Sequence, residues 1–318
     1  MNPNWPAQGA PRSGKIYFVH DGKAAYPELA AYKRYFDGSY TAEELSQDEV
    51  RTRSDLSESI CWHMMGFYPK ALPAKLVIHD YRSLSVGRFR SLKDRMKGMF
   101  NASPDLRIFQ NEPMRKAMGF SDAVPTLLLP MGVPEFVSAS RRESAAGSTG
   151  PYCYIGAMSA ERKTHLMIDS FIKRFGSEKI FSLYGDPEPY LVDRYKDHQN
   201  IEFLGKFPQD ILFNKLKAAA ACVCYFPNHY PHLLQTPTKL LEYAALGQRI
   251  IANKQAISLE TAKTYGIACL WGDTEDMFAG APDSATWEDN IDTDYALFTW
   301  PEVIRKSGVD EKIKVLTN

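Results

Sequence analysis

The sequence lacks an excess of charge of either sign, because its 38 lysines and arginines balance 38 aspartates and glutamates. This balance gives no reason to expect a nucleic-acid partner, although a local basic patch stays open. Long apolar runs are also missing, and none approaches the roughly 20 residues that span a bilayer. The opening "MNPNWPAQGAPRSG" has neither the basic start nor the apolar run of a signal peptide. We therefore expect a soluble, cytoplasmic protein.

Cysteine is scarce, with five residues and none of the spacings typical of metal ligands. Cys222 and Cys224 alternate within "AAACVCYF", which has the pattern of a buried strand. Reduced thiols are the simplest interpretation. His229 and His232 in "PNHYPH" stand without acidic or thiol partners, so we predict no metal site there.

Apolar segments that end in polar residues alternate with helical segments along the chain. In the first half we predict strands at "KIYFVHDG", "AKLVIHDYRS", "LRIFQN" and "PTLLLPMGVP", and helices at "YPELAAYKRYF", "DLSESICWHMMGF", "SLKDRMKGMF" and "EPMRKAMGF". In the second half the strands are "YCYIGAM", "KIFSLYGD", "NIEFLGK", "ACVCYF", "QRIIAN" and "IACLWG", with helices at "THLMIDSFIKRFG" and "QDILFNKLKAAAA". This alternation is typical of parallel sheets covered by helices on both faces.

A Ser-, Ala- and Gly-rich run separates the halves and predicts a linker at residues 138–150. We expect a flexible tail at residues 1–13, an N-terminal acceptor-side domain at 14–137 and a C-terminal domain at 151–295. The expected fold class is α/β, with two Rossmann-like domains facing a cleft. Ligands bind such sheets outside the carboxyl ends of the strands. No GxGxxG follows any predicted strand, which argues against a dehydrogenase.

The segment "QTPTKLLEYAALGQRIIA" places a lysine near the start of a predicted helix. Thr236 fits the N-cap, Pro237 the first helical position and Gly247 the stop. Lys239 then lies in the first turn, where the helix dipole already presents positive charge. A surface ion pair with Glu242 is one interpretation, but lysine before glutamate is the less favourable order. An anion held by the helix N-terminus and Lys239 explains the cation better.

A nucleoside diphosphate suits this arrangement, with its phosphates on the first-turn amides and Lys239 and its ribose hydroxyls on Glu242. A second segment, "YIGAMSAERKTHLMIDSF", has Gly156 at a strand end and the basic pair Arg162 and Lys163 in the following loop. Glycine permits close backbone approach, and the basic pair can reach phosphate. A solvated basic loop is the alternative.

These segments occur in the order found in a known family. "YIGAMSAERK", "FSLYGD", "IEFLGKF" and "PTKLLEYAALGQRIIA" resemble the glycine-then-basic loop, the next strand, the base-contacting loop and the donor helix of retaining GT-B glycosyltransferases, bacterial surface-polysaccharide enzymes among them. "LLPMGVPEF" resembles the end of their first domain. "FTWPEVIRKSG" resembles their late helix, which here implies that residues 296–318 cross back to the N-terminal domain. The resemblance covers most of residues 128–308.

The resemblance implies a metal-independent enzyme that moves a sugar, with retention, from a UDP- or GDP-type nucleotide sugar to a hydroxyl of a glycan or lipid-linked acceptor. No further cofactor is implied, and the expected context is capsule, lipopolysaccharide or exopolysaccharide assembly. By resemblance, Arg162 and Lys239 neutralise the diphosphate, Glu242 holds the ribose, and Lys206 and Phe207 flank the base. The other donor-binding residues that we expect are Gly22, Gly156, Lys163, Gly185, Gln235, Thr236, Thr238 and Leu240.

Two positions depart from the family pattern. Many members carry a second glutamate near the donor sugar where this sequence has Leu234, and an arginine where it has Ala157. Contacts of Gln235, Thr236 and Thr238 with sugar or phosphate would then replace them. Leu234 also keeps an alternative open, a non-catalytic sugar-nucleotide-binding subunit of a glycan-assembly complex.

The first half offers two further candidates in "LVIHDYRS". His79 and Asp80 stand at the carboxyl end of a predicted strand, and we expect them to face the cleft as catalytic residues that contact sugar or acceptor. The alternative is a hydrogen-bonded pair that only orders a loop. Gly22 holds the equivalent position after the first strand, where it would let a diphosphate approach.

The stretch Arg82–Lys97 carries six basic residues and one acid, Asp94. Apolar residues lie among or just after them, namely Phe89, Met96, Met99 and Phe100. Such a basic amphipathic stretch can lie on an anionic membrane surface, which would make the protein peripheral at the inner face of the cell membrane. A solvated helix face is the alternative.

Overall fold

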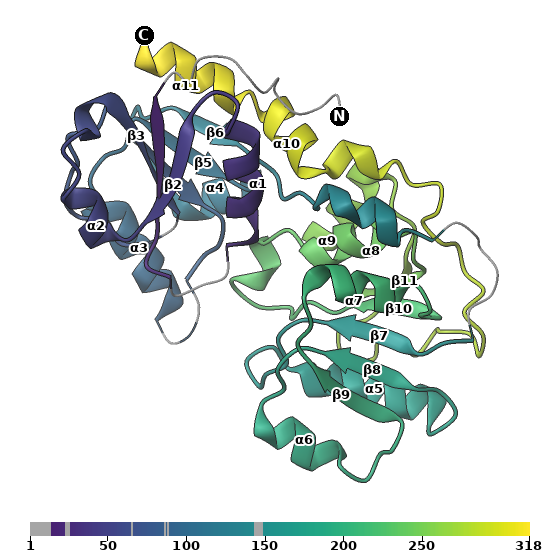
Figure 1. Ribbon diagram of the computed structural model, residues 1–318. Coiled ribbons are helices and arrows are strands. Elements are labelled where there is room, and N and C mark those ends of the chain that lie inside the picture. Colours follow the sequence, from purple (N-terminus) through teal and green to yellow (C-terminus); the bar gives the residue numbers. More distant parts are fainter. Residues whose placement is uncertain (1–13, 23–25, 65, 86, 88, 143–148) are drawn as a thin grey trace. The chain divides into compact units, whose positions relative to one another are not determined.

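The computed structural model describes residues 14–22, 26–64, 66–85, 87, 89–142 and 149–318. The predicted tail at 1–13, Arg88 of the basic stretch and the linker residues 143–148 lie outside the described residues. The chain divides into two compact units (Figure 1). The first consists of Met1–Gly132 and Thr299–Asn318, and the second of Val133–Phe298.

The first unit contains a parallel six-stranded sheet in the order β2-β1-β3-β4-β5-β6. The strands are β1 (Lys15–Val19), β2 (Thr41–Leu45), β3 (Ser59–Met64), β4 (Leu76–Tyr81), β5 (Leu106–Phe109) and β6 (Thr126–Leu128). The helices are α1 (Pro27–Phe36), α2 (Gln47–Arg51), α3 (Arg90–Phe100), α4 (Glu112–Met118), α10 (Trp300–Ser307) and α11 (Val309–Thr317), with a short 3-10 turn η1 (Leu56–Glu58). Strand β3 is buried along its whole length because it lies inside the sheet.

The helix predicted at "DLSESICWHMMGF" is wrong, because the middle of this segment, Ser59–Met64, forms β3. A strand that is covered on both faces reads as a continuous apolar run, which periodicity alone does not separate from a buried helix. The edge strand β2, "TAEEL", was not predicted either. Its acidic residues give it little of the β-branched and aromatic character of a strand.

The second unit has the same architecture, with strand order β12-β11-β10-β7-β8-β9. Its strands are β7 (Tyr152–Ile155), β8 (Phe181–Tyr184), β9 (Ile201–Gly205), β10 (Ala221–Cys224), β11 (Ile250–Asn253) and β12 (Leu270–Gly272). The order reverses between β7 and β10, so the carboxyl ends of these strands flank the crevice where such sheets bind ligands.

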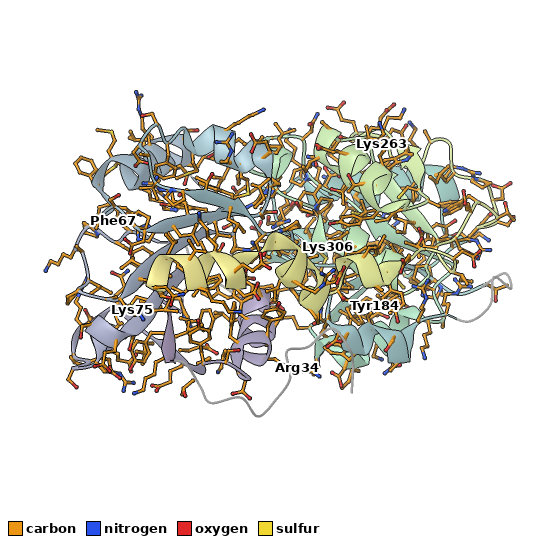
Figure 2. All side chains as sticks on the ribbon, turned by 90° about the horizontal axis from the view of Figure 1, so that it is seen from above. Arg34, Phe67, Lys75, Tyr184, Lys263 and Lys306 are labelled. Atoms are coloured by element: carbon orange, nitrogen blue, oxygen red, sulfur yellow. The ribbon has the colours of Figure 1, made fainter. Side chains whose placement is uncertain are left out.

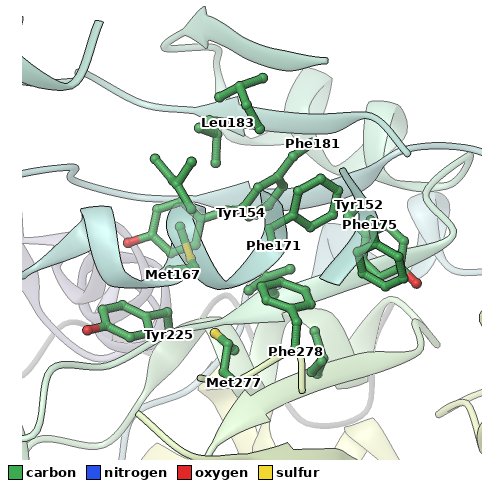
Figure 3. Close-up of a cluster of buried hydrophobic side chains, with 14 of the residues drawn as sticks. Tyr152, Tyr154, Met167, Phe171, Phe175, Phe181, Leu183, Tyr225, Met277 and Phe278 are labelled. Atoms are coloured by element: carbon green, nitrogen blue, oxygen red, sulfur yellow. The ribbon is translucent and has the colours of Figure 1, made fainter. Parts of the chain in front are cut away.

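The helices of this unit are α5 (Thr164–Phe175), α6 (Pro189–Tyr195), α7 (Gln209–Leu216), α8 (Thr238–Ala245) and α9 (Ala256–Tyr265). Three 3-10 turns complete it, namely η2 (Glu135–Ser140), η3 (His232–Leu234) and η4 (Tyr295–Phe298). Its core is strongly aromatic. The Phe171 ring stacks on Phe181 at 4.6 Å and meets Phe278 edge-on at 5.3 Å, and Figure 3 shows these rings gathered between helix and strands.

No helix in the described ranges combines the length and the apolar character needed to cross a membrane. The side chains of both units are drawn in Figure 2.

Two histidines lie in the core of the first unit. His63 on β3 and His79 on β4 are both buried, with ring centroids 5.3 Å apart. Neither Nδ1 atom has a hydrogen-bond partner among the described residues. Burial lowers the pKa of His63 to about 4 and that of His79 to about 3. Both imidazoles are therefore neutral at neutral pH.

These pKa values predict acid sensitivity. An unfolded histidine takes up a proton near pH 6.5, whereas the folded ones resist protonation, so the unfolded state gains relative stability as the pH falls. Between pH 7.5 and 5, each histidine should remove about 2 kcal/mol from the free energy of unfolding. Glu28, whose pKa burial raises to about 7, acts in the opposite direction.

The contribution of one histidine is isolated by comparing His79→Phe with the wild type in urea denaturation across this pH range. The wild type should lose stability relative to the variant on acidification. A difference that stays constant with pH would contradict the prediction.

Candidate functional site

Three glycines end the neighbouring strands β7, β8 and β9. Gly156, Gly185 and Gly205 have φ angles of +136°, +140° and +75°. The Gly156 N–H donates to the Tyr184 carbonyl at 2.8 Å, and the Gly185 N–H donates to the Gly205 carbonyl at 2.9 Å. A Cβ at Gly185 would lie 2.1 Å from the Gly156 carbonyl oxygen. The absence of side chains therefore lets these strand ends close on one another.

A pocket of about 270 Å³ opens at this edge of the sheet. Its lining joins four predicted donor-site residues, Gly156, Gly185, Lys206 and Phe207. The Phe207 ring meets Tyr184 edge-on at 5.9 Å. Lys206 pairs with Asp186 at the rim. The pocket thus offers glycine backbone on one wall and an aromatic face on another, which suits a flat heterocycle.

Lys239 lies beside Gly156, in the first turn of α8, and is only 9% exposed. Its Nζ atom lies 5.0 Å and 5.2 Å from the ring centroids of Tyr154 and Phe226. A Cβ at Gly156 would stand 2.5 Å from the Lys239 Cε atom. Within the described part of the chain, no carboxylate lies within ion-pairing distance of this ammonium group. The Lys239 ammonium group therefore lies between aromatic ring faces at a helix N-terminus, with no carboxylate of the described residues paired to it, and an anion can bind there.

Helix α8 begins one residue later than predicted, with Pro237 and not Thr236 at the N-cap. The Pro237 carbonyl accepts the Leu240 N–H at 2.9 Å, which makes a tight first turn. Lys239 stays in that turn, so the predicted meeting of cation and helix N-terminus is unchanged. The predicted stop is confirmed, because Gly247 has a φ of +69°.

The C-terminal turn of α8 is anchored inside the second unit. The Ile155 N–H at the end of β7 donates to the Tyr243 hydroxyl at 3.0 Å. Arg141 donates to the carbonyls of Ala244 and Ala245, the last helical residues, at 3.3 Å and 2.6 Å. A cation at the C-terminus complements the helix dipole. These contacts fix the position of Lys239 relative to β7.

Glu242 does not pair with Lys239 within 4 Å, so the predicted alternative of a surface ion pair is absent from the described contacts. Its Oε1 atom accepts a hydrogen bond from Gln209 of α7 at 2.8 Å. Burial raises its pKa to about 7, and the nearby Lys239 charge and the Gln209 hydrogen bond only partly offset this effect. Glu242 therefore titrates near neutral pH.

The basic loop after β7 is held by its own residues and by two neighbours. The Arg162 N–H donates to Ser159 Oγ at 3.2 Å, and Lys163 has a φ of +51° before α5 begins. Tyr154 donates its hydroxyl hydrogen to the Ala157 carbonyl at 3.1 Å. This tyrosine is also the one whose ring lies under the Lys239 ammonium, so one side chain connects the loop to the cation.

His229 provides the second support of this loop. Its Nε2 atom lies 2.7 Å from the Glu161 carbonyl oxygen. Its ring also packs against His232 at 5.3 Å. Sequence reasoning considered His229 only as a metal ligand and so missed this contact, because no local signal indicates a hydrogen bond across 68 residues. Gln209 was missed for the same reason.

The residues before and within α8 have different surroundings. Gln235, Thr236 and Thr238 are half-buried between η3 and the first turn. Leu240, predicted among the donor-binding residues, is fully buried. Its side chain packs in the core on the inner face of α8, and the predicted contact with the donor stays a prediction.

The predicted residues of the first unit are placed differently from expectation. Strand β4 runs to Tyr81, so His79 and Asp80 lie near its carboxyl end as predicted, but both are buried, on opposite faces of the sheet. Asp80 Oδ2 accepts hydrogen bonds from the Tyr32 hydroxyl and the Trp62 Nε1–H, both at 3.1 Å. Burial raises the Asp80 pKa, against the charge of Arg82. The surroundings of both residues are those of structural groups, which corrects the expected exposure to substrate.

Gly22 is exposed, has a φ of +68° and donates its N–H to His20 Nδ1 at 3.1 Å. It belongs to the first unit, whereas Gly156, Lys239 and Glu242 belong to the second. No group of three or more histidine, cysteine, aspartate or glutamate side chains with the geometry to hold a metal ion occurs in the ranges that the structure describes.

No protein-family model matches the sequence, and no curated protein matches it. Among solved structures, the chain is similar to Anabaena HepE in complex with UDP-glucose, with a TM-score of 0.68 and 12% identity over 94% of this chain and 99% of that one. It is also similar to AviGT4, a glycosyltransferase involved in avilamycin A biosynthesis, with a TM-score of 0.59 and 13% identity over 96% and 98% of the two chains.

The pneumococcal O-GlcNAc transferase GtfA in complex with UDP and GlcNAc gives a TM-score of 0.55 at 9% identity over 80% of this chain and 57% of that one. At these identities the likeness shows the fold alone. Together with the two parallel sheets, it confirms the predicted α/β class and the GT-B fold with Rossmann-like domains.

The close approach of Gly156 and Lys239 predicts that one added methyl group displaces the end of the lysine side chain. Gly156→Ala should lower the free energy of unfolding by more than the roughly 1–2 kcal/mol that an unfavourable φ costs, because the new Cβ also displaces the Lys239 side chain. The matched control is Gly14→Ala, where φ is +152° and the nearest atom to the added Cβ, the Glu58 carbonyl oxygen, lies 3.7 Å away.

The double variant Gly156→Ala with Lys239→Ala separates the two causes in urea denaturation. Removing the lysine should recover the part of the loss that exceeds the control. Equal losses in Gly156→Ala and Gly14→Ala would contradict the steric account.

Proposed function

We propose that the protein is a glycosyltransferase that moves a sugar from a nucleotide-diphosphate sugar to a hydroxyl acceptor with retention at the anomeric carbon. One observation carries the proposal. The Lys239 ammonium group is buried at a helix N-terminus beside glycine backbone, with no carboxylate counter-ion among the described residues. A phosphate group would supply the missing charge.

The neighbouring groups fit the rest of a nucleotide. The pocket beside Phe207 accommodates the base, and Glu242, one turn beyond Lys239, accepts hydrogen bonds from the ribose hydroxyls. UDP is the donor nucleotide that we favour over GDP, because HepE and GtfA bind UDP in structures of similar fold. Gln235, Thr236 and Thr238 precede or open α8 and are available to the sugar or the phosphates.

The proposed chemistry is electrostatic. When the bond between the anomeric carbon and the phosphate oxygen breaks, negative charge accumulates on the leaving diphosphate. Lys239, Arg162 and the first-turn amides of α8 stabilise that charge in a partly buried site. Because these groups neutralise the diphosphate themselves, we propose that no metal ion and no further cofactor is required.

The acceptor is proposed to be a glycan or a lipid-linked sugar on the cytoplasmic side of the membrane, in capsule, lipopolysaccharide or exopolysaccharide assembly. The motif resemblance of residues 128–308 supports this context. A protein of this kind works in the cytoplasm, where nucleotide sugars are made, and meets its acceptor at the inner membrane face.

A second candidate is a non-catalytic subunit that binds the nucleotide sugar. Two observations favour it. Leu234 occupies the position of an acid near the donor sugar, and the carboxylate of Asp80 is buried in the first unit. The two candidates share the nucleotide site and differ in turnover.

Substitutions at the proposed phosphate and ribose contacts should weaken nucleotide binding. Lys239→Gln and Glu242→Gln should each reduce UDP affinity by about 10- to 150-fold, the loss of one charge-assisted contact. The Glu242→Gln effect should shrink below pH 7, because the Glu242 pKa is about 7 and the wild-type side chain is then protonated and neutral. Isothermal titration calorimetry at pH 6 and pH 8 measures both effects.

The control for this experiment is Lys263→Gln, which removes an exposed lysine from α9. Its UDP affinity should equal that of the wild type. If Lys239→Gln also binds UDP as the wild type does, the proposed phosphate site is wrong.

Donor hydrolysis in excess chelator tests turnover and metal independence together. An enzyme of this class slowly hydrolyses UDP-sugar without acceptor, and we expect release of UDP to continue in EDTA at the untreated rate. Binding of UDP-sugar without any release would favour the subunit, whereas release that requires added Mg²⁺ or Mn²⁺ would contradict metal independence.

A further inference from the structure

Helix α3 exposes an apolar stripe. Phe89, just before its first residue, and four residues of the helix are spaced by three or four positions, which places them on one face. They are between 43% and 67% exposed, and they are Phe89, Leu92, Met96, Met99 and Phe100. Large side chains gathered in this way are unusual on a protein surface and mark interaction sites.

The opposite face of α3 is the one that packs on the protein. Asp94 is buried, and both of its carboxylate oxygens accept the Ser85 N–H, at 3.0 Å and 3.1 Å. A Cβ at Gly98 would lie 3.8 Å from Phe120, just beyond α4. Asp94 and Gly98 share a face about half a turn away from the apolar stripe. The orientation of the helix is therefore fixed, with the stripe turned outward.

Phe67, from another part of the chain, lies in a loop that is hydrogen-bonded next to the C-terminal end of α3. It is 45% exposed and stands in a loop held by Asn101, the residue after α3. The Asn101 side chain accepts the Tyr68 N–H at 2.8 Å and donates to the Gly66 carbonyl at 3.3 Å. Phe67 is labelled toward one end of the first unit in Figure 2. Phe67 and the stripe form what we call the α3 surface.

Cations flank the α3 surface. Helical spacing places Lys93 along one side of the stripe and Arg95 along the other, and Arg90 and Lys97 lie beyond Lys93. The single acid of the helix, Asp94, is turned inward and lies 3.5 Å from Lys97. The outward charge is therefore positive only. This arrangement disfavours a second copy of the chain, whose α3 surface would bring like charges together.

We propose that the α3 surface docks on an anionic lipid bilayer, with the helix lying in the interface and its apolar side chains inserted among the acyl chains. Lysines and arginines beside an apolar face are the pattern of an interfacial helix, and anionic head groups complement their charge. This interaction does not depend on nucleotide binding, because all of its residues belong to the first unit.

Flotation with vesicles tests the proposal on the full chain without nucleotide. The protein should float with vesicles of phosphatidylglycerol and phosphatidylcholine at low salt, and not with phosphatidylcholine alone. Binding should fall as salt screens the attraction. Lys93→Gln with Arg95→Gln should lower the partition coefficient about five-fold for each charge removed. Leu92→Gln with Met99→Gln should abolish flotation.

The matched control is Leu259→Gln with Lys263→Gln, which removes an exposed leucine and an exposed lysine from α9 of the second unit. It should float as the wild type does. Circular dichroism and UDP affinity verify that each variant is folded. The proposal is overturned if the wild type does not float at low salt, or if both α3 variants float like the control. It is also overturned if light scattering shows a dimer that Leu92→Gln with Met99→Gln dissociates.

Discussion

The candidate site depends on one electrostatic constraint, the burial of the Lys239 ammonium group at the positive end of α8. Helix dipole and lysine have the same sign there, so the arrangement is unfavourable without compensation. The ring faces of Tyr154 and Phe226 compensate part of this positive charge. The missing side chain of Gly156 supplies the space. We propose that the remaining imbalance attracts an anion to this edge of the sheet.

The same constraint shapes the protonation of Glu242. A carboxylate so close to a lysine would ordinarily have a low pKa, yet burial raises it to about 7 and outweighs the Lys239 charge. The Gln209 amide holds one of its oxygens at 2.8 Å. A ligand hydroxyl that donated a hydrogen bond to the Glu242 carboxylate would favour its ionised form, because burial has removed the water that would otherwise do so. Binding of a polyhydroxyl group and deprotonation of Glu242 should therefore reinforce each other.

The sequence predicted what short-range patterns encode. The strand ends at Gly156 and Gly185, the first-turn position of Lys239 and the stop at Gly247 all follow from local propensity and spacing. The sequence-based predictions failed where contacts between distant parts of the chain determine the local structure. Strand β3 was mistaken for a helix because burial on both faces removes the alternation. The support of the basic loop by His229 was missed because its partner, the Glu161 carbonyl, is distant in sequence and carries no side-chain signal.

A comparison of two buried cations separates structural from functional charge. Arg82 of the first unit donates to the Leu129 and Pro130 carbonyls at 2.5 Å and 3.2 Å, and Asp80 lies 3.8 Å away. Its charge is used within the fold, where it fixes the chain that follows β6. Lys239 is buried to a similar extent, but its ammonium group faces the aromatic rings of Tyr154 and Phe226, whereas the Arg82 guanidinium faces oxygen atoms. A buried cation that the protein surrounds with carbonyls and a carboxylate stabilises the fold, whereas one that faces rings and glycine leaves its hydrogen-bond donors for a ligand. By this criterion the proposed anion site lies in the second unit, and the charged core of the first unit serves stability.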